Sequence, residues 1–142
     1  LHVRSRRQRQ MCIRDRTYYD LPGGGQHLYE TMEEAVAREV LEETGIPVEV
    51  ELFAGLVEEI TTDPALRGEY PEYSHRVLHI FRVRRTGEAL GCCCEKDLGQ
   101  EGSVWVTPEE ADQLPLRPQN LRGHISELLS SGSAAFWGTV KR

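Results

Sequence analysis

The sequence has no long hydrophobic run: no stretch of its 142 residues approaches the roughly 18 apolar residues that a membrane-spanning helix requires. Cysteine is scarce, with four in the chain. Three of them are adjacent, at Cys92, Cys93 and Cys94, a spacing that forms neither a disulfide framework nor a C-x-x-C pair. No apolar segment of the secretory type is present near residue 1. These absences exclude a membrane protein and a disulfide-stapled scaffold, and they predict one cytoplasmic domain without a membrane partner.

Positive charge is concentrated at one end of the chain. Residues 1–16 contain six arginines and one aspartate, a formal charge of +5. The other 11 basic and 22 acidic residues give residues 17–142 a formal charge of −11. A basic arm on an acidic domain is typical of nucleic-acid or membrane contact, or of a solvated disordered tail.

The basic arm has a further interpretation. The segment Arg6–Arg16 (RRQRQMCIRDR) back-translates with permitted codons into a common transposase-based sequencing adapter. We therefore predict that residues 1–16 are translated adapter sequence and that residues 17–142 form the domain, with its native N-terminal part missing. On this prediction the arm forms no part of the fold and gives no reason to expect a nucleic-acid partner.

Residues 17–142 alternate between strand and helix patterns, which predicts an α/β domain built on a mixed β-sheet. Strands are expected at 17–21, 48–60, 75–84 and 103–107. Helices are expected from Thr31 to Thr44, from Pro108 onward, and at 118–130. Residues 61–74 and 85–102 are rich in Pro, Gly or polar side chains and are expected to be loops.

The first predicted helix carries the strongest local signals. Thr31 and Glu34 form a T-x-x-E capping box, and Gly45 is placed to end the helix. Three glutamates spaced by three and four residues share one helix face: Glu39, Glu42 and Glu43. Carboxylates so close repel one another, so the helix is destabilised unless a cation compensates. Their hard oxygen atoms suit Mg²⁺ or Mn²⁺, although an isolated acidic motif of this kind is more often a solvated helix face.

The residues around these glutamates form a longer motif. It reads G-x5-E-x7-R-E-U-x-E-E-x-G-U, where U is aliphatic, and every fixed position is matched: Gly24, Glu30, Arg38, Glu39, Val40, Glu42, Glu43, Gly45 and Ile46. This motif is the Nudix box, and the sequence resembles the Nudix hydrolases, the MutT-like superfamily, with weaker likeness from Tyr18 to about Leu121. The resemblance implies an α/β/α sandwich with a mixed β-sheet. It also implies metal-dependent hydrolysis of a nucleoside diphosphate linked to another moiety.

The resemblance implies a role for each residue of the motif. Four groups are implied to hold Mg²⁺ or Mn²⁺: the side chains of Glu39, Glu42 and Glu43 and the carbonyl of Gly23. Arg38 completes the implied catalytic set, and together with Glu30 it is implied to brace the loop against the helix. Gly24 and Gly45 are implied to be structural positions of the motif.

The family's first strand normally precedes the residues that read YYDLPGGG in this sequence. The predicted adapter residues stand at that place here. The sheet is therefore expected to lack its native first strand.

The general base for the attacking water is assigned less directly. A carboxylate of the box can serve, and in some relatives a glutamate on the loop before a W-V strand does so. Glu101 fits that place best, followed by Glu95 and Glu88, although each alone is more often a surface acid. Several aromatic residues can stack on a nucleobase, although packing in or beside the core is their commoner role: Tyr18, Tyr19, Tyr70, Tyr73 and Trp105.

Two classes of function are consistent with the sequence. The first is a pyrophosphohydrolase, and the second is a catalytically silent domain that binds a nucleotide as a sensor. The complete box favours the enzyme, since a silent domain has no need of both Glu42 and Glu43. The expected partner in both cases is a nucleotide-type small molecule. Nucleoside triphosphates, ADP-ribose or nucleotide sugars, and dinucleoside polyphosphates all stay open as substrates.

Overall fold

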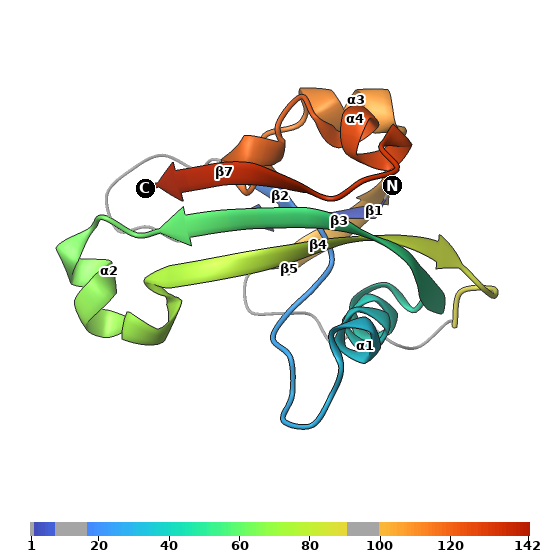
Figure 1. Ribbon diagram of the computed structural model, residues 1–142, viewed down its shortest axis with the longest axis horizontal. Helices are drawn as coiled ribbons and strands as arrows, with labels where there is room; N and C mark the ends of the chain where they lie inside the picture. Colours follow the sequence, from blue (N-terminus) through green and yellow to red (C-terminus); the bar gives the residue numbers. More distant parts are fainter. Residues whose placement is uncertain (1, 8–16, 91–99) are drawn as a thin grey trace.

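The computed structural model of the chain describes residues 2–7, 17–90 and 100–142, which form two β-sheets (Figure 1). One sheet has four strands in the order β5–β1–β2–β6, namely Gln100–Trp105, His2–Arg7, Thr17–Asp20 and Leu116–Arg117. The other has three strands in the order β4–β3–β7, namely His75–Arg85, Val48–Ile60 and Ala135–Lys141. Each sheet combines one parallel pair, β2–β6 or β3–β7, with antiparallel pairing, so both sheets are mixed, as predicted.

Helices cover the sheets from two sides. Helix α1 (Met32–Thr44) packs against β3, whereas α3 (Pro108–Gln113) and α4 (Ile125–Ser130) lie on the opposite side in Figure 1. Helix α2 (Pro64–Glu69) lies beyond the other end of β3. This arrangement confirms the predicted α/β/α class. Within residues 2–7, 17–90 and 100–142, no helix has the length and apolar character needed to cross a membrane.

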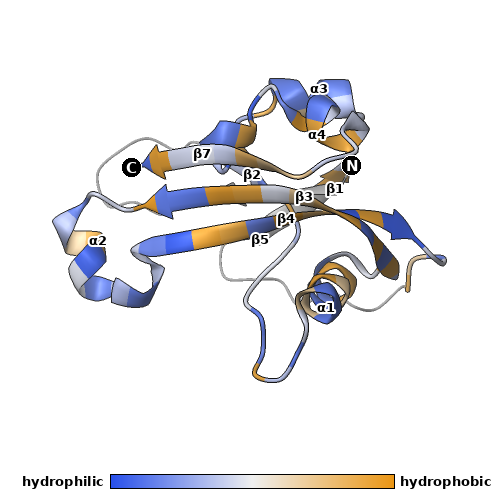
Figure 2. Cartoon of the chain, in the orientation of Figure 1, coloured by the Kyte–Doolittle hydropathy of each residue, from blue (hydrophilic) through white to orange (hydrophobic). Residues whose placement is uncertain are grey.

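The hydrophobic core joins the two sheets beneath α3 and α4. Its largest fully buried side chains come from β3, β6, α4 and the short 3-10 helix η2 (Gln119–Leu121): Val57, Leu116, Ile125 and Leu121. The hydrophobic segments of β3, β7 and α4 are orange in Figure 2. Tyr19 and Leu21, at the end of β2, pack against this cluster. Because side chains alternate along a strand, Tyr18 and Asp20 lie on the face of the sheet that is turned away from the core.

Helix α1 begins and ends where the sequence predicts. The Thr31 side chain accepts a hydrogen bond from the Glu34 N–H at 3.2 Å, and the Glu34 carboxylate accepts one from the Thr31 N–H at 2.8 Å. At the other end Gly45 has a φ of 70°, a left-handed conformation that favours glycine, and its N–H donates to the carbonyl of Leu41 at 2.8 Å. Local hydrogen bonds fix both ends, which is why the sequence alone defined this helix.

The predicted loop at residues 61–74 is wrong in part, because it contains α2 and a short 3-10 helix, η1 (Pro71–Tyr73). Asp63 caps α2 by accepting a hydrogen bond from the Ala65 N–H at 2.8 Å, and Pro64 occupies the first helical turn. Proline is tolerated there because the missing N–H has no partner inside the helix. From the sequence, this proline was interpreted as a loop signal and not as the start of a helix.

The single helix predicted over residues 118–130 is wrong in extent. The structure has η2 and α4 instead, separated by Gly123 with a φ of 75°. Asp112 of α3 accepts a hydrogen bond from the Ile125 N–H at 2.5 Å and so fixes where α4 begins. Strands β6 and β7 were not predicted. A strand of two residues has no periodicity to detect, and Gly138 weakens the strand pattern of β7.

The prediction that residues 1–16 form no part of the fold is wrong for His2–Arg7. This segment is β1, which pairs antiparallel with β2 on one side and with β5 on the other. The sheet is therefore not short of a strand before YYDLPGGG. The physical reason is that backbone groups make the hydrogen bonds of a sheet, so a short extended segment can fill the gap between two strand edges whatever its side chains. The remaining positions of the predicted adapter, 1 and 8–16, lie outside the described residues.

Candidate active site

The loop that follows β2 lies against the acidic face of α1. The N–H of Gly23 donates a hydrogen bond to Glu43 Oε2 at 2.9 Å. Glu43 is only 5% exposed, and a buried carboxylate requires such hydrogen bonds to offset the loss of water. The fold thus brings together two of the predicted metal-site residues and fixes Glu43 against the loop.

Gly24 leaves the space that the Glu39 carboxylate occupies. A Cβ atom at residue 24 would lie 2.4 Å from Glu39 Oε1 and 2.5 Å from Oε2, so any side chain there would displace this carboxylate. At the neighbouring Gly25, a Cβ atom would meet nothing within 4 Å. The first glycine of the box is therefore required for a steric reason, since the loop passes directly over Glu39.

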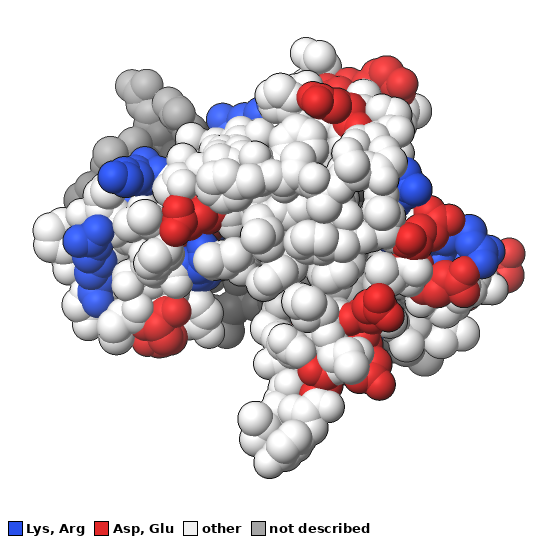
Figure 3. Space-filling view, viewed as in Figure 1, with Lys and Arg blue, Asp and Glu red and all other residues white. Residues whose placement is uncertain are grey.

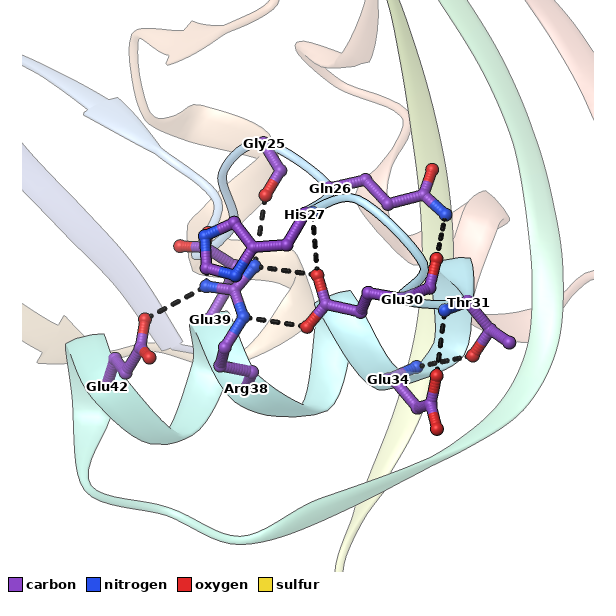
Figure 4. A network of polar contacts seen from close by, with 9 residues as sticks. All are labelled: Gly25, Gln26, His27, Glu30, Thr31, Glu34, Arg38, Glu39 and Glu42. Atoms are coloured by element: carbon purple, nitrogen blue, oxygen red, sulfur yellow. Dashed lines mark hydrogen bonds and ion pairs between the residues drawn. The ribbon is translucent and has the colours of Figure 1, made fainter.

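Arg38 links the same loop to three carboxylates (Figure 4). Its Nε and Nη2 donate to the two carboxylate oxygens of Glu30 at 2.7 and 3.0 Å, and Nη2 also donates to the carbonyl of Gly25 at 3.0 Å. Its Nη1 donates to Glu39 Oε1 at 2.8 Å and to Glu42 Oε2 at 3.0 Å. One side chain therefore ties the loop to the helix and contacts two carboxylates of the predicted metal site.

These contacts hold Glu30 in its ionised form. Hydrogen bonds from Arg38, and then one from the backbone N–H of His27 at 2.9 Å, lower the pKa of Glu30 to about 2. In return, hydrogen bonds to Glu30 first and to Glu39 second raise the pKa of Arg38 above its ordinary value. The bridge between Glu30 and Arg38 is thus charged throughout the pH range in which the protein would work.

Negative charge is in excess around α1. A single guanidinium contacts Glu30, Glu39 and Glu42. On the face of the molecule drawn in Figure 3, the surface over α1 shows acidic atoms without basic ones. Because like charges at this spacing destabilise a helix, the arrangement favours a bound cation.

The residues on this face fit a divalent cation by their chemistry. Glu39, Glu42 and Glu43 provide carboxylate oxygens, the donors that Mg²⁺ and Mn²⁺ prefer. In the part of the chain that the structure describes, however, no three His, Cys, Asp or Glu side chains are grouped around one point. Glu39 and Glu42 are instead turned toward Arg38. Each of these two carboxylates contacts the guanidinium through one oxygen, Glu39 Oε1 and Glu42 Oε2, so the contacts with Arg38 do not involve the second oxygen of either.

The structure does not place any of the residues predicted as general bases beside the acidic face of α1. Glu101 lies in β5, but its side chain is outside the described part of the structure, and Glu95 falls in the undescribed residues 91–99. Cys92–Cys94 fall in the same undescribed segment. Glu88 is exposed and pairs with Arg85 at 2.8 Å. Glu101 therefore stays a prediction.

Among the aromatic residues considered for base stacking, Tyr18 has a cationic neighbour. The Cζ atom of Arg117 lies 3.8 Å from the centroid of the Tyr18 ring. Tyr19 packs against the core instead, and Tyr70 and Tyr73 are exposed near α2. Arg117 was not predicted to lie beside Tyr18, and no motif could have indicated it, because this position follows from the pairing of β6 with β2.

Comparison with known proteins gives consistent matches. The family model described as NUDIX domain matches residues 3–128. A MutT-like protein from Streptomyces ambofaciens is 36% identical over 100 residues, which cover 70% of this chain and 54% of that protein. The chain thus spans about half the length of this curated relative. Among solved structures, an ADP-ribose pyrophosphatase from Streptococcus suis matches with a TM-score of 0.53 and 16% identity, covering 98% of this chain and 88% of that one.

The chain therefore belongs to the Nudix family. The family match extends from β1 into α4 and includes the box and the loop before it, while β7 lies outside it. The solved structure has the same fold, and at 16% identity the comparison shows the fold alone. The resemblance stated from the sequence is confirmed.

Proposed function

We propose that the chain hydrolyses the pyrophosphate bond of a nucleoside diphosphate linked to another moiety, with Mg²⁺ or Mn²⁺ as its cofactor. The observation that carries this proposal is the fit between loop and helix: Gly24 leaves room for the Glu39 carboxylate, and the Gly23 N–H binds Glu43. A merely solvated acidic face would not need glycines fitted to its carboxylates. Membership of the Nudix family supports the same class of reaction.

The proposed ion ligands are Glu39, Glu42, Glu43 and the carbonyl of Gly23. When bound, a divalent ion neutralises phosphate oxygens and lowers the pKa of a coordinated water. The chain's own contribution is to position these ligands: Gly23 fixes Glu43, and Arg38 fixes Glu39 and Glu42. In-line attack at phosphorus depends mainly on positioning and charge, so this arrangement is the main contribution of the protein to rate.

Glu101 is our proposed general base outside the box. If it removes the proton from the attacking water, Glu101→Gln should lower kcat by about 10²–10⁴, the usual range for general-base catalysis. An unchanged kcat would show that Glu101 is a surface acid and that a carboxylate of the box acts as the base. Circular dichroism of the variant would confirm that the fold is intact.

The proposed substrate is a small nucleotide, either a nucleoside triphosphate or a member of the ADP-ribose and nucleotide-sugar class. The printed names of the two relatives, MutT-like protein and ADP-ribose pyrophosphatase, support this range. Both classes contain the diphosphate that the site would bind. We propose that the domain acts on them in the cytoplasm, without a nucleic-acid or membrane partner.

The proposal is tested by incubating the purified full chain with ATP, ADP-ribose, UDP-glucose and diadenosine tetraphosphate in Mg²⁺, in Mn²⁺ or in excess EDTA. We expect release of a nucleoside monophosphate from at least one compound, in the presence of metal only. Full turnover in excess EDTA would exclude the metal-dependent reaction. Binding of a nucleotide without turnover would identify the alternative, a silent domain that senses nucleotides. If the chain neither binds nor hydrolyses any of these compounds, both functions are contradicted.

A further inference from the structure

We propose that Arg76 and Arg142 form a binding site for a phosphate group at the end of β3 that lies away from α1. In Figure 1 the C-terminus and α2 lie at one end of β3, whereas α1 lies near its other end, so this site is separate from the metal-site carboxylates. It does not depend on the function proposed above, and the two proposals can fail separately.

Two arginines from different strands of the sheet converge on one carboxylate. Arg76 of β4 stands opposite Glu59 of β3, and its Nη2 forms an ion pair with Glu59 Oε2. Arg142 directly follows β7, and its Nη2 lies 3.6 Å from the same oxygen. Backbone hydrogen bonds hold Arg142 in this place, because its N–H donates to the carbonyl of Ile60 at 3.0 Å and its carbonyl accepts from the N–H of Thr62.

Positive charge is in excess around this carboxylate. The Glu59 side chain is only 5% exposed, whereas those of Arg76 and Arg142 are 36% and 33% exposed. The adjacent carboxylate, Glu58, contacts His75 and lies on the other face of β3, since side chains alternate along a strand. A ligand that approaches the Glu59 side of the sheet therefore meets two cations and one largely buried anion.

Most N–H donors of the two guanidinium groups have no protein acceptor. Each group has five such donors. Within the described part of the chain, Arg76 donates only from Nη2, and its Nε is buried without a hydrogen-bond partner. The guanidinium of Arg142 makes no hydrogen bond there, because 3.6 Å is longer than one. By contrast, Arg38 engages Glu30 through both Nε and Nη2, as a structural pair does.

A phosphate group suits these two side chains. Because both Nη2 atoms contact one oxygen, at hydrogen-bond distance and at 3.6 Å, they lie within about 7 Å of each other. Arginine donates to two phosphate oxygens at once, and a phosphate has enough oxygens for two arginines. Arg67 of α2 adds a third cation at this end of β3, where its Nε donates to the carbonyl of Thr61. Inorganic phosphate and a phosphate ester share this chemistry.

The experiment is a calorimetric titration of the full chain with inorganic phosphate and, separately, with glycerol 3-phosphate, at constant ionic strength and without divalent metal. Arg142→Gln removes one of the two cations and leaves Arg76 paired with the buried Glu59. We expect the Kd for inorganic phosphate to rise about tenfold in this variant, because charge-assisted hydrogen bonds to the ligand are lost. Thermal melts would confirm that the variant is folded.

The matched control is Lys141→Gln. It makes the same change of charge at the adjacent residue of β7, whose side chain lies on the other face of the sheet, and it should bind phosphate as wild type does. In wild type, tighter binding of glycerol 3-phosphate than of inorganic phosphate would support the site and identify an ester as its ligand. Equal or weaker binding of the ester would identify the free ion.

Three results would overturn the site. Equal weakening in Arg142→Gln and Lys141→Gln would show that phosphate responds to the net charge of the chain and not to this pair of arginines. Wild-type affinity in Arg142→Gln would exclude Arg142, and absence of binding by the wild-type chain would exclude the site altogether. Failure of the proposed function has a different signature, namely no hydrolysis of any nucleotide with Mg²⁺, whatever the phosphate titration shows.

Discussion

The two largest groups of ion pairs in the described part of the molecule differ in the ratio of acidic to basic side chains. Along β3 and β4, each carboxylate contacts a basic side chain on the other strand: Glu49 with Arg84, Glu51 with Arg82, Glu58 with His75 and Glu59 with Arg76. At α1, by contrast, Arg38 alone contacts Glu30, Glu39 and Glu42. In Figure 3 the surface at one end of β3 and β4 shows both charges together, whereas the surface over α1 shows acidic atoms. The ladder links β3 to β4 with paired charges, whereas the cluster at α1 has an excess of negative charge, and it is there that we propose a cation binds.

Between these two groups, the largest expected effect follows from removing charge at α1. Glu42→Gln and Glu43→Gln keep the side-chain volume and should lower kcat by about 10²–10³, because loss of one preorganised electrostatic element costs roughly 3–4 kcal/mol of transition-state stabilisation. The measurement is kcat on one accepted substrate at saturating Mg²⁺, with circular dichroism to check folding. Glu49→Gln removes a carboxylate from the ladder and should leave kcat unchanged. Wild-type kcat in both helix variants would show that the metal site is elsewhere.

A smaller effect is expected from Gly24→Ala. The added Cβ atom would overlap the Glu39 carboxylate, which is the end of a flexible side chain and can move without unfolding the helix. We expect kcat/KM to fall by about 10–100-fold, as for other groups that orient a metal ligand. Gly25→Ala adds a methyl group to open space and is the matched control. If the two variants have equal activity, the contact between Gly24 and Glu39 has no role in catalysis.

A third prediction concerns acid stability. The pKa of Glu30 is lowered from 4.5 to about 2 in the folded chain, so its contribution to stability is complete above pH 4.5 and is lost as the pH falls toward 2. Glu30→Gln should therefore have a lower Tm than wild type at neutral pH, and the difference should shrink over that acidic interval. Thermal melts of both proteins from pH 7 to pH 2.5 measure it. A Tm difference that stays constant across this range would contradict the bridge to Arg38.

The smallest effect is expected at the exposed end of the ladder. Arg84 and Glu49 are both more than half exposed, so Arg84→Gln should lower the free energy of unfolding by about 0–1 kcal/mol. Urea titration measures this difference, and added salt should reduce it further, because exposed pairs are screened. A loss of several kcal/mol would show that the ladder, and not only the core, determines stability.

The sequence predicted the fold best where local hydrogen bonds define an element. The capping box of Thr31 and Glu34, and the left-handed Gly45, set both ends of α1 without help from the rest of the chain. Strand β6 has no such signal, since it is two residues long and exists only because β2 lies beside it. The break at Gly123 likewise depends on Asp112, which caps α4 from another helix.

The candidate site shows the same division. The spacing of Glu39, Glu42 and Glu43 was sufficient to predict that they share a helix face. No motif could predict that Glu39 and Glu42 share one guanidinium, because this depends on distances between side chains. The position of Arg117 over Tyr18 likewise depends on strand pairing.

Strand β1 shows that a segment can take part in the fold whatever the origin of its sequence. His2–Arg7 completes a sheet through backbone pairing. We still propose that Arg6–Arg16 is translated adapter, because the proposal concerns its codons and not its conformation. The nucleotide sequence across these residues tests it directly, and codons that differ from the adapter would refute it.

The presence of a cation site at α1 is tested most directly by Mn²⁺ binding, followed through the electron paramagnetic resonance signal of the free ion. Wild type and the ladder variant Glu49→Gln should bind Mn²⁺ alike. Glu42→Gln and Glu43→Gln should bind it about 10–100-fold more weakly, if loss of a ligand costs at least as much as loss of a group that orients one. Equal Mn²⁺ affinity in all four proteins would contradict the placement of the ion on the acidic face of α1.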